Sequence, residues 1–167
     1  MQSTKIDTIE VDQTIIGGNL LYDRSTGDTS RRDERNLRDP NNPEAVSAYS
    51  RSFNLKKDFS QRLKYAKAAL DLNPSHAFSN NDYGLALCNI KRFEECETHI
   101  EKAMELDPIR RHSYEQFLPL LYMAMRESQK ALEWSNILHD RNGHSRFDGF
   151  RAVIFVHLGD IESGKAY

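Results

Sequence analysis

The sequence has few of the residues that tie a small fold together covalently or anchor it in a membrane. Only two cysteines, Cys88 and Cys96, occur among its 167 residues, too few for a disulfide framework. It has no N-x-S/T glycosylation site and no apolar core of a signal peptide. No apolar run approaches the roughly 20 residues that cross a bilayer. These absences predict a protein without membrane contact in a reducing compartment, with the cytoplasm as its expected location.

An excess of charge of one sign is also lacking. Twenty-three basic and 25 acidic side chains leave a net charge of −2, so no global field favours nucleic acid or an anionic membrane as a partner. Hydrophobic residues make up 38% of the chain and charged residues 29%. This balance is typical of an elongated helical protein, or of a folded part joined to a disordered one.

Motifs that carry catalysis or bind cofactors are missing as well. There is no G-x-S-x-G, H-E-x-x-H, P-loop or G-x-G-x-x-G sequence. The six histidines are scattered, and His139 and His144 have no neighbouring residue that could complete a metal site. The Glu94-Glu95 pair begins a predicted helix, where it complements the helix dipole. We therefore expect neither an enzyme nor a cofactor or metal site.

Three Asx-Pro pairs punctuate the chain at equal intervals. Asp39-Pro40, Asn73-Pro74 and Asp107-Pro108 follow one another at steps of 34 residues. Proline cannot continue a helix and disfavours helical angles in the preceding residue, so each pair should end a helix. Between the pairs, apolar residues recur at steps of three and four, as amphipathic helices require. The interval predicts a repeat of two helices per unit, with first helices at 43–55 and 76–90 and second helices at 59–72 and 93–106.

The second unit has the clearest pattern. Gly84 and Cys96 are small residues where the two helices of a hairpin should cross, and Phe93 and Ile100 should fill the space between hairpins. The full set of matching positions is Tyr83, Gly84, Leu87, Phe93, Cys96, Ile100, Ala103 and Pro108. This set resembles the signature of the tetratricopeptide repeat family. The resemblance covers roughly three quarters of the chain and implies an all-α superhelix, a solenoid of about 3.5 helical hairpins that binds other proteins.

The predicted organisation divides the chain into an N-terminal segment and a repeat domain. Residues 1–42 should be non-helical, with a short hairpin or a flexible tail at 6–22 and a polar linker at 23–42. The repeat domain should cover 43–167. Its third unit contains Pro119, which should kink the first helix, and its fourth unit ends early. The expected units are 43–76, 77–110, 111–144 and 145–167.

The resemblance also implies where a partner binds, since the first helix of each unit lines the concave face of such a solenoid. The polar and apolar side chains expected there suggest an extended peptide or a partner's helix. These peptide-binding candidates are Ser47, Arg51, Asn54, Asn81, Leu85, Cys88, Asn89, Gln116, Leu120 and Met123, followed in the fourth unit by Val153, Val156 and His157.

Some family members hold a C-terminal carboxylate with cationic and Asn side chains on three successive first helices. The matching positions here are Ser47, Arg51 and Asp82, followed by Ser113 and Phe117, or by His112 and Gln116 in the adjacent register. Only Arg51 is cationic, and Asp82 should repel a carboxylate. We predict that this chain does not bind chaperone tails in that way.

The leading hypothesis is a scaffold for protein–protein contact, with a protein or peptide partner. One alternative is a regulatory fragment of a larger signalling protein, because Lys130–Trp134 and Leu158-Gly159-Asp160 weakly resemble the repeat tails of bacterial adenylate cyclases and transcriptional regulators. Another is a small secretion-type chaperone. The short fourth unit leaves apolar surface, which residues 1–22, missing chain or a second subunit could cover, the last giving a homodimer through the C-terminal end.

Overall fold

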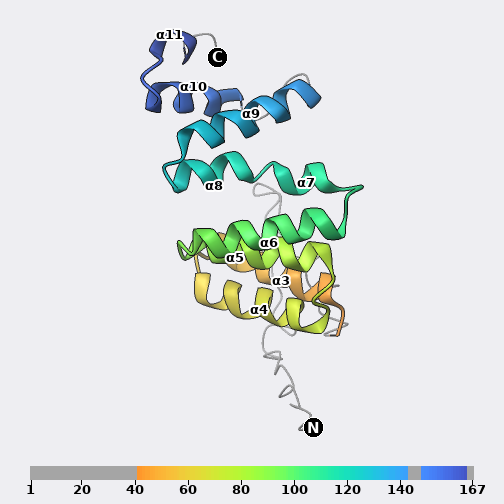
Figure 1. Ribbon diagram of the computed structural model, residues 1–167. Coiled ribbons are helices and arrows are strands. Elements are labelled where there is room, and N and C mark those ends of the chain that lie inside the picture. The colour runs from red at the N-terminus through yellow and green to blue at the C-terminus, as the bar shows by residue number, and fades with distance from the viewer. Residues whose placement is uncertain (1–40, 143–147, 165–167) are drawn as a thin grey trace, which may run out of the picture.

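The described part of the chain is a stack of antiparallel helical hairpins. A computed structural model describes residues 41–142 and 148–164, and these residues contain helices but no strand. Figure 1 shows the hairpins stacked from α3 and α4 at one end to α10 and α11 at the other. The helices are α3 (Pro43–Leu55), α4 (Phe59–Leu72), α5 (Ala77–Asn89), α6 (Phe93–Leu106), α7 (Arg111–Glu115), α8 (Leu118–Ala124), α9 (Ser128–Asn142), α10 (Asp148–His157) and α11 (Ile161–Gly164).

This architecture confirms the predicted fold class, an all-α superhelix of helical hairpins. Helices α3, α4 and α6 have the predicted bounds, and α5 is one residue shorter than expected at each end, because His76 is its N-cap and Ile90 its C-cap. Asn42 caps α3, since its side chain accepts hydrogen bonds from the backbone amides of Glu44 at 2.9 Å and Ala45 at 3.3 Å. The predicted hairpin at 6–22 lies outside the described residues, as does the linker apart from its last two positions.

Each hairpin turns in the same way. The turn residues Lys57, Lys91, Arg126 and Gly159 all have positive φ, at 54°, 64°, 64° and 81°. In every case the amide of the turn residue donates to the carbonyl three residues before it, and the next amide donates to the carbonyl five before its own position. This pair of bonds is the Schellman motif, which satisfies the last carbonyl groups of a helix. The turn residues follow one another at steps of 34, 35 and 33, so they define the register of the whole stack.

The third hairpin is interrupted as Pro119 predicts. Its first helix is split into α7 and α8, with Pro119 in the first turn of α8. Proline lacks an amide hydrogen and its ring crowds the preceding turn, so a continuous helix through this position is disfavoured. Proline is well tolerated in a first turn. The chain therefore restarts the helix at Leu118.

One continuous apolar core runs through the stack. It includes Leu87 of α5, Ile100 of α6, Leu118 of α8, Ala131 of α9 and Ile154 of α10, which are all buried almost completely. Each hairpin buries apolar side chains against the next, as repeat proteins require.

Gly84 allows the closest approach between α5 and α6. A Cβ atom at this position would lie 3.0 Å from the carbonyl oxygen of Cys96 and 3.1 Å from Cβ of His99. This contact confirms the expected crossing of two helices at small residues.

The two cysteines correct one expectation from the sequence. Cys88 and Cys96 form a disulfide between α5 and α6, with a Cα–Cα distance of 5.4 Å. The sequence predicted a packing cysteine at 96 and an inward-facing thiol at 88. Cys96 is indeed fully buried at the helix crossing, but Cys88 lies opposite it across the turn, within bonding range. Because disulfides are rare in reducing compartments, this bond does not fit the expected environment.

Candidate functional site

Four residues occupy equivalent positions on successive first helices. Arg51 of α3, Leu85 of α5, Leu120 of α8 and Val153 of α10 each lie six residues before the positive-φ residue of their own hairpin turn. We call these four residues the central row. The side chain of Arg51 is 47% exposed, Leu120 and Val153 are 38% and 46% exposed, and Leu85 is partly buried. The row presents one cation followed by three aliphatic side chains along the stack.

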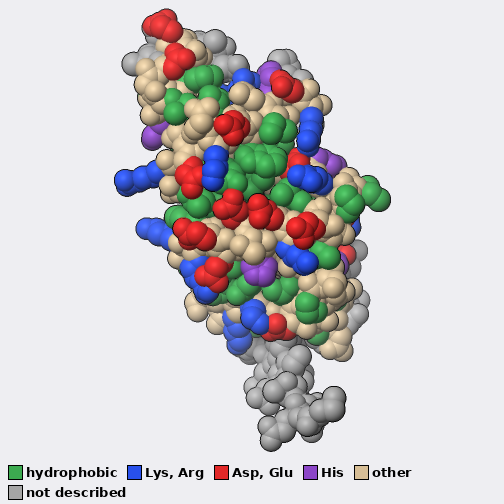
Figure 2. Space-filling model, in the orientation of Figure 1, with side chains coloured by type: hydrophobic (Ala, Val, Ile, Leu, Met, Phe, Trp, Pro, Cys, Tyr) green, Lys and Arg blue, Asp and Glu red, His purple; other side chains and the backbone are tan. Residues whose placement is uncertain are grey.

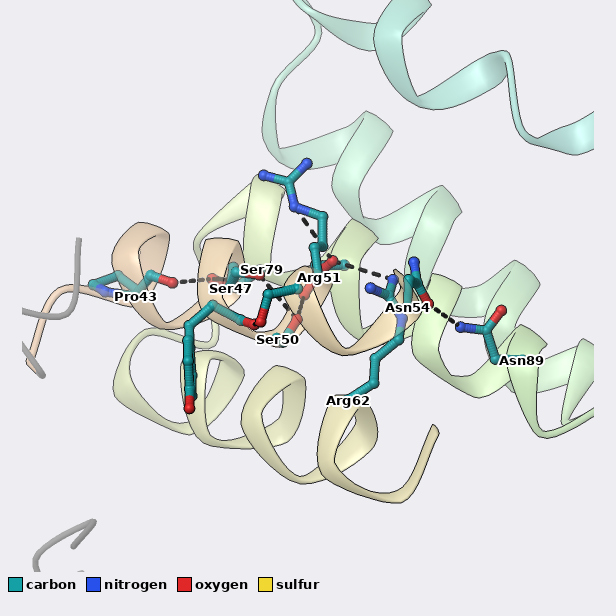
Figure 3. Close-up of polar contacts among 11 residues, drawn as sticks. Pro43, Ser47, Ser50, Arg51, Asn54, Arg62, Ser79 and Asn89 are labelled. Carbon is teal, nitrogen blue, oxygen red and sulfur yellow. Dashed lines mark hydrogen bonds and ion pairs between the residues drawn. The ribbon is translucent and has the colours of Figure 1, made fainter. Parts of the chain in front are cut away.

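A second row lies three residues further along each first helix. It consists of Asn54, Cys88, Met123 and Val156, and Asn89 follows Cys88. We call both rows together with Asn89 the first-helix face. The side-chain amide of Asn89 donates a hydrogen bond to Oδ1 of Asn54 at 2.9 Å, and both residues are exposed (Figure 3). This bond joins α3 to α5 on the surface and leaves the Asn54 amide nitrogen and the Asn89 amide oxygen without a hydrogen bond among the described residues.

Arg51 is held at the surface by two neighbours. Its guanidinium lies over the ring of Phe78, 4.3 Å from the ring centroid, and its Nε lies 3.8 Å from Oδ1 of Asp82. In Figure 3 the two terminal nitrogens point away from α3, and neither has a hydrogen-bond partner among the described residues. The contact with the aromatic ring stabilises the guanidinium here, and its terminal nitrogens stay available to an acceptor.

A buried polar cluster lies beneath Arg51. The Asp82 carboxylate accepts a hydrogen bond from the Ser50 hydroxyl and lies 3.3 Å from Nη2 of Arg62, whose side chain is almost completely buried. Burial raises the pKa of the Asp82 carboxyl, while the Arg62 guanidinium and the Ser50 hydroxyl oppose that shift. Nε and Nη1 of Arg62 have no hydrogen-bond partner in the part of the chain that the structure describes. Two guanidinium groups therefore share one carboxylate, and the cluster keeps a net positive charge.

This cluster changes the argument about carboxylate repulsion. Asp82 was expected to repel a carboxylate on the concave face, but it is buried and its charge is directed to Arg62 and Ser50. The absence of chaperone-tail binding stays a prediction, and it now depends on the lack of further cations rather than on Asp82.

The remaining candidates differ in their access to a ligand. Ser47 was expected on the peptide-binding face, but it is fully buried. Its hydroxyl lies 3.1 Å from that of Ser79, between α3 and α5. Asn81 is buried as well, and no described residue forms a hydrogen bond with its Oδ1. The Gln116 side chain donates to the carbonyl of Ser113 at 2.7 Å. His157 is exposed, with its Nδ1 lying 3.1 Å from the carbonyl of Val153.

Several buried ionic residues, among them Arg62 and Glu115, were missed from the sequence. Arg62 lies 34 residues before Cys96, at a position where the repeat favours a small residue, and this departure was a readable signal of a buried ion pair. Glu115 is fully buried and pairs with Arg111 at 2.7 Å and with Arg141 of α9. No local pattern indicates the second contact, since Arg141 lies 26 residues away.

The surface in Figure 2 is more acidic than the first-helix face. Acidic side chains gather across its middle, over the second helix α6, which contributes Glu94, Glu97 and Glu101. Within residues 41–142 and 148–164, no group of three His, Cys, Asp or Glu side chains is arranged to hold a metal. No helix in that part of the chain is long and apolar enough to cross a membrane.

Comparison with known structures identifies the fold. A crystal structure of MamA superposes with a TM-score of 0.64 at 20% identity over 86% of each chain. MamA 41-end from Desulfovibrio magneticus RS-1 also gives 0.64, at 17% identity over 75% of this chain and 71% of that one. These are helical-repeat proteins of the tetratricopeptide type. The chain has a tetratricopeptide-type fold.

A larger assembly contains the same architecture. A chain in the structure of Naa15/Naa10 bound to HypK-THB matches with a TM-score of 0.53 at 19% identity, over 81% of this chain but 21% of that chain. No protein-family model matches the sequence, and no curated protein sequence matches it. At these identities the likeness concerns the fold alone.

Proposed function

We propose that this chain is a protein-interaction scaffold that binds a partner segment along its first-helix face. The observation that supports this most directly is the central row, in which Arg51, Leu120 and Val153 are exposed at equivalent positions on three hairpins. A row of exposed aliphatic side chains at equivalent positions is a typical docking surface. The structural relatives are consistent with this role, since the Naa15/Naa10 structure contains HypK-THB as a bound partner.

The test is affinity capture from a lysate with a matched pair of variants. One variant carries Arg51→Glu, Asn54→Ala and Leu85→Ala on the first-helix face. The other carries Lys64→Glu, Ser60→Ala and Gln129→Ala, which are exposed positions on the second helices α4 and α9. We expect the first variant to lose specific partners and the second to keep them. An unchanged set of partners in the first variant would rule out this face.

The C-terminal end of the stack has exposed apolar side chains that a second copy of the chain could cover. Val153, Val156 and Leu158 are exposed at the C-terminal end, which supports a homodimer there as the alternative use of apolar surface. Light scattering across a concentration series would detect such a dimer. The regulatory-fragment and secretion-chaperone hypotheses, and the cytoplasmic location, stay predictions.

A further inference from the structure

The central row changes its chemistry along the stack in one direction. It begins with the exposed cation Arg51 and continues with Leu85, Leu120 and Val153. We propose that the first-helix face binds an extended segment of another protein, with an Asp or Glu side chain opposite Arg51 and aliphatic side chains opposite Leu85 and Leu120. This inference rests on the proposed scaffold function and specifies the chemistry of its partner.

Charge complementarity assigns the acidic residue. Arg51 and Arg62 face a single carboxylate, that of Asp82, and Asp82 lies closer to Arg62, at 3.3 Å against 3.8 Å. The described residues therefore leave part of the Arg51 charge without a carboxylate partner, and its terminal nitrogens point outward (Figure 3). The Arg51 guanidinium lies over the Phe78 ring, and a guanidinium offers two parallel donors, the geometry that matches a carboxylate.

The two asparagines favour an extended partner over a helical one. Among the described residues, no partner is bound to the Asn54 amide donor or to the Asn89 amide acceptor beside the central row. An extended backbone presents unpaired N–H and C=O groups that these amides can satisfy, whereas the backbone groups inside a helix are already paired.

The spacing of the row predicts the spacing of the partner's side chains. Packed helices lie about 10 Å apart, and an extended chain rises about 3.3 Å per residue. Helices α3 and α5 pack against each other, so the step from Arg51 to Leu85 corresponds to about three residues of the partner. The expected pattern is an acidic residue with an aliphatic residue about three positions away and a second aliphatic residue further along, in one chain direction or the other.

The experiment is a selection from a displayed random peptide library, with peptides of about twelve residues, on the immobilised full chain. The same selection is made on the Arg51→Glu variant and on Lys64→Glu, a matched charge reversal at an exposed position of α4. We expect wild type and Lys64→Glu to enrich an acidic residue about three positions from an aliphatic one. On Arg51→Glu the acidic position should become Lys or Arg.

A direct affinity measurement completes the test. For one enriched peptide, Arg51→Glu should weaken binding about tenfold or more, and replacing the peptide's acid by Lys should restore it. Restoration by charge exchange separates recognition from a loss of folding. Equal enrichment of the same sequences on wild type and Arg51→Glu would overturn the proposal, and so would the absence of any enriched sequence.

The outcomes also separate this inference from the scaffold function. If first-helix variants abolish partner capture but no acidic position is enriched, the inference fails and the scaffold function stands. If capture is unaffected by those variants, the scaffold function itself fails. Self-association that requires Arg51 and excludes the peptides would make a second copy of the chain the occupant, and would overturn a foreign extended segment.

Discussion

The guanidinium of Arg62 lies 3.3 Å from the carboxylate of Asp82, and both side chains are withdrawn from solvent between the first and second hairpins. Removing one partner of a buried pair leaves an uncompensated charge, which typically costs about 3 to 5 kcal/mol. Replacing both partners by apolar side chains removes that penalty. The intact pair therefore adds little net free energy to the packing of the two hairpins, whereas the loss of one partner is strongly destabilising.

The first prediction concerns this pair. Asp82→Leu should lower the free energy of unfolding by about 3 kcal/mol or more, because Arg62 stays buried without its partner. Adding Arg62→Leu to that variant should recover most of the loss. Urea unfolding of the wild type, both single variants and the double variant measures the coupling directly. Additive losses in the double variant would show that the two residues act independently.

The second prediction concerns the hairpin turns. Lys91 has a φ of 64°, a conformation that costs a residue with a Cβ roughly 1 kcal/mol relative to glycine. Lys91→Gly should therefore raise stability by up to about 1 kcal/mol in thermal or urea unfolding. Lys64→Gly is the control: it places glycine inside α4 and should lower stability by about 1 kcal/mol. Equal losses in both variants would contradict this account of the turn.

The third prediction concerns the disulfide. Cys88 and Cys96 are eight residues apart, and closing a loop of this length removes unfolded-state entropy worth roughly 2 kcal/mol. A reductant should lower the melting temperature of the wild type. A variant with Cys88→Ser and Cys96→Ala should melt at the same temperature with and without reductant. If the wild type is also insensitive, the bond contributes nothing to stability.

The fourth prediction concerns pH. Burial lowers the pKa of His99 on α6, although Glu95 opposes the shift, and the ring packs edge-on against Tyr83. The unfolded chain then binds a proton before the folded chain does as pH falls below about 6.5. This contribution is present above that pH and is lost as pH falls through the folded pKa. His99→Gln should reduce the loss of stability on acidification, measured by urea unfolding at about pH 8 and about pH 5.5.

Sequence periodicity predicted the hairpins well because it reports two local properties. Helix ends depend on residues such as Pro74 and Pro108, and buried faces depend on the spacing of apolar residues, so the helix bounds in the first two units follow closely. The kink at Pro119 was equally local. Side-chain pairing across units was harder, since Arg141 and Glu115 meet only after the third hairpin has folded.

The candidate site was predicted in part for the same reason. The positions on the first helices follow from the repeat, and Arg51, Asn54 and Leu120 are exposed there. Ser47 shows the limit of that reasoning, because its burial depends on Ser79 of the neighbouring helix. Whether a residue faces solvent or the next hairpin depends on how closely two helices pack, which a single position does not reveal.

The ion pair also has a consequence for the order in which hairpins assemble. Arg62 needs a carboxylate on the helix that follows it, and Asp82 of the second hairpin supplies one nine residues before its turn residue, Lys91. The third hairpin carries Phe117 at the equivalent distance before Arg126. If the third hairpin docked on the first by mistake, it would leave a buried guanidinium facing a phenyl ring. A single buried charge thus favours docking of the second hairpin, and not the third, against the first.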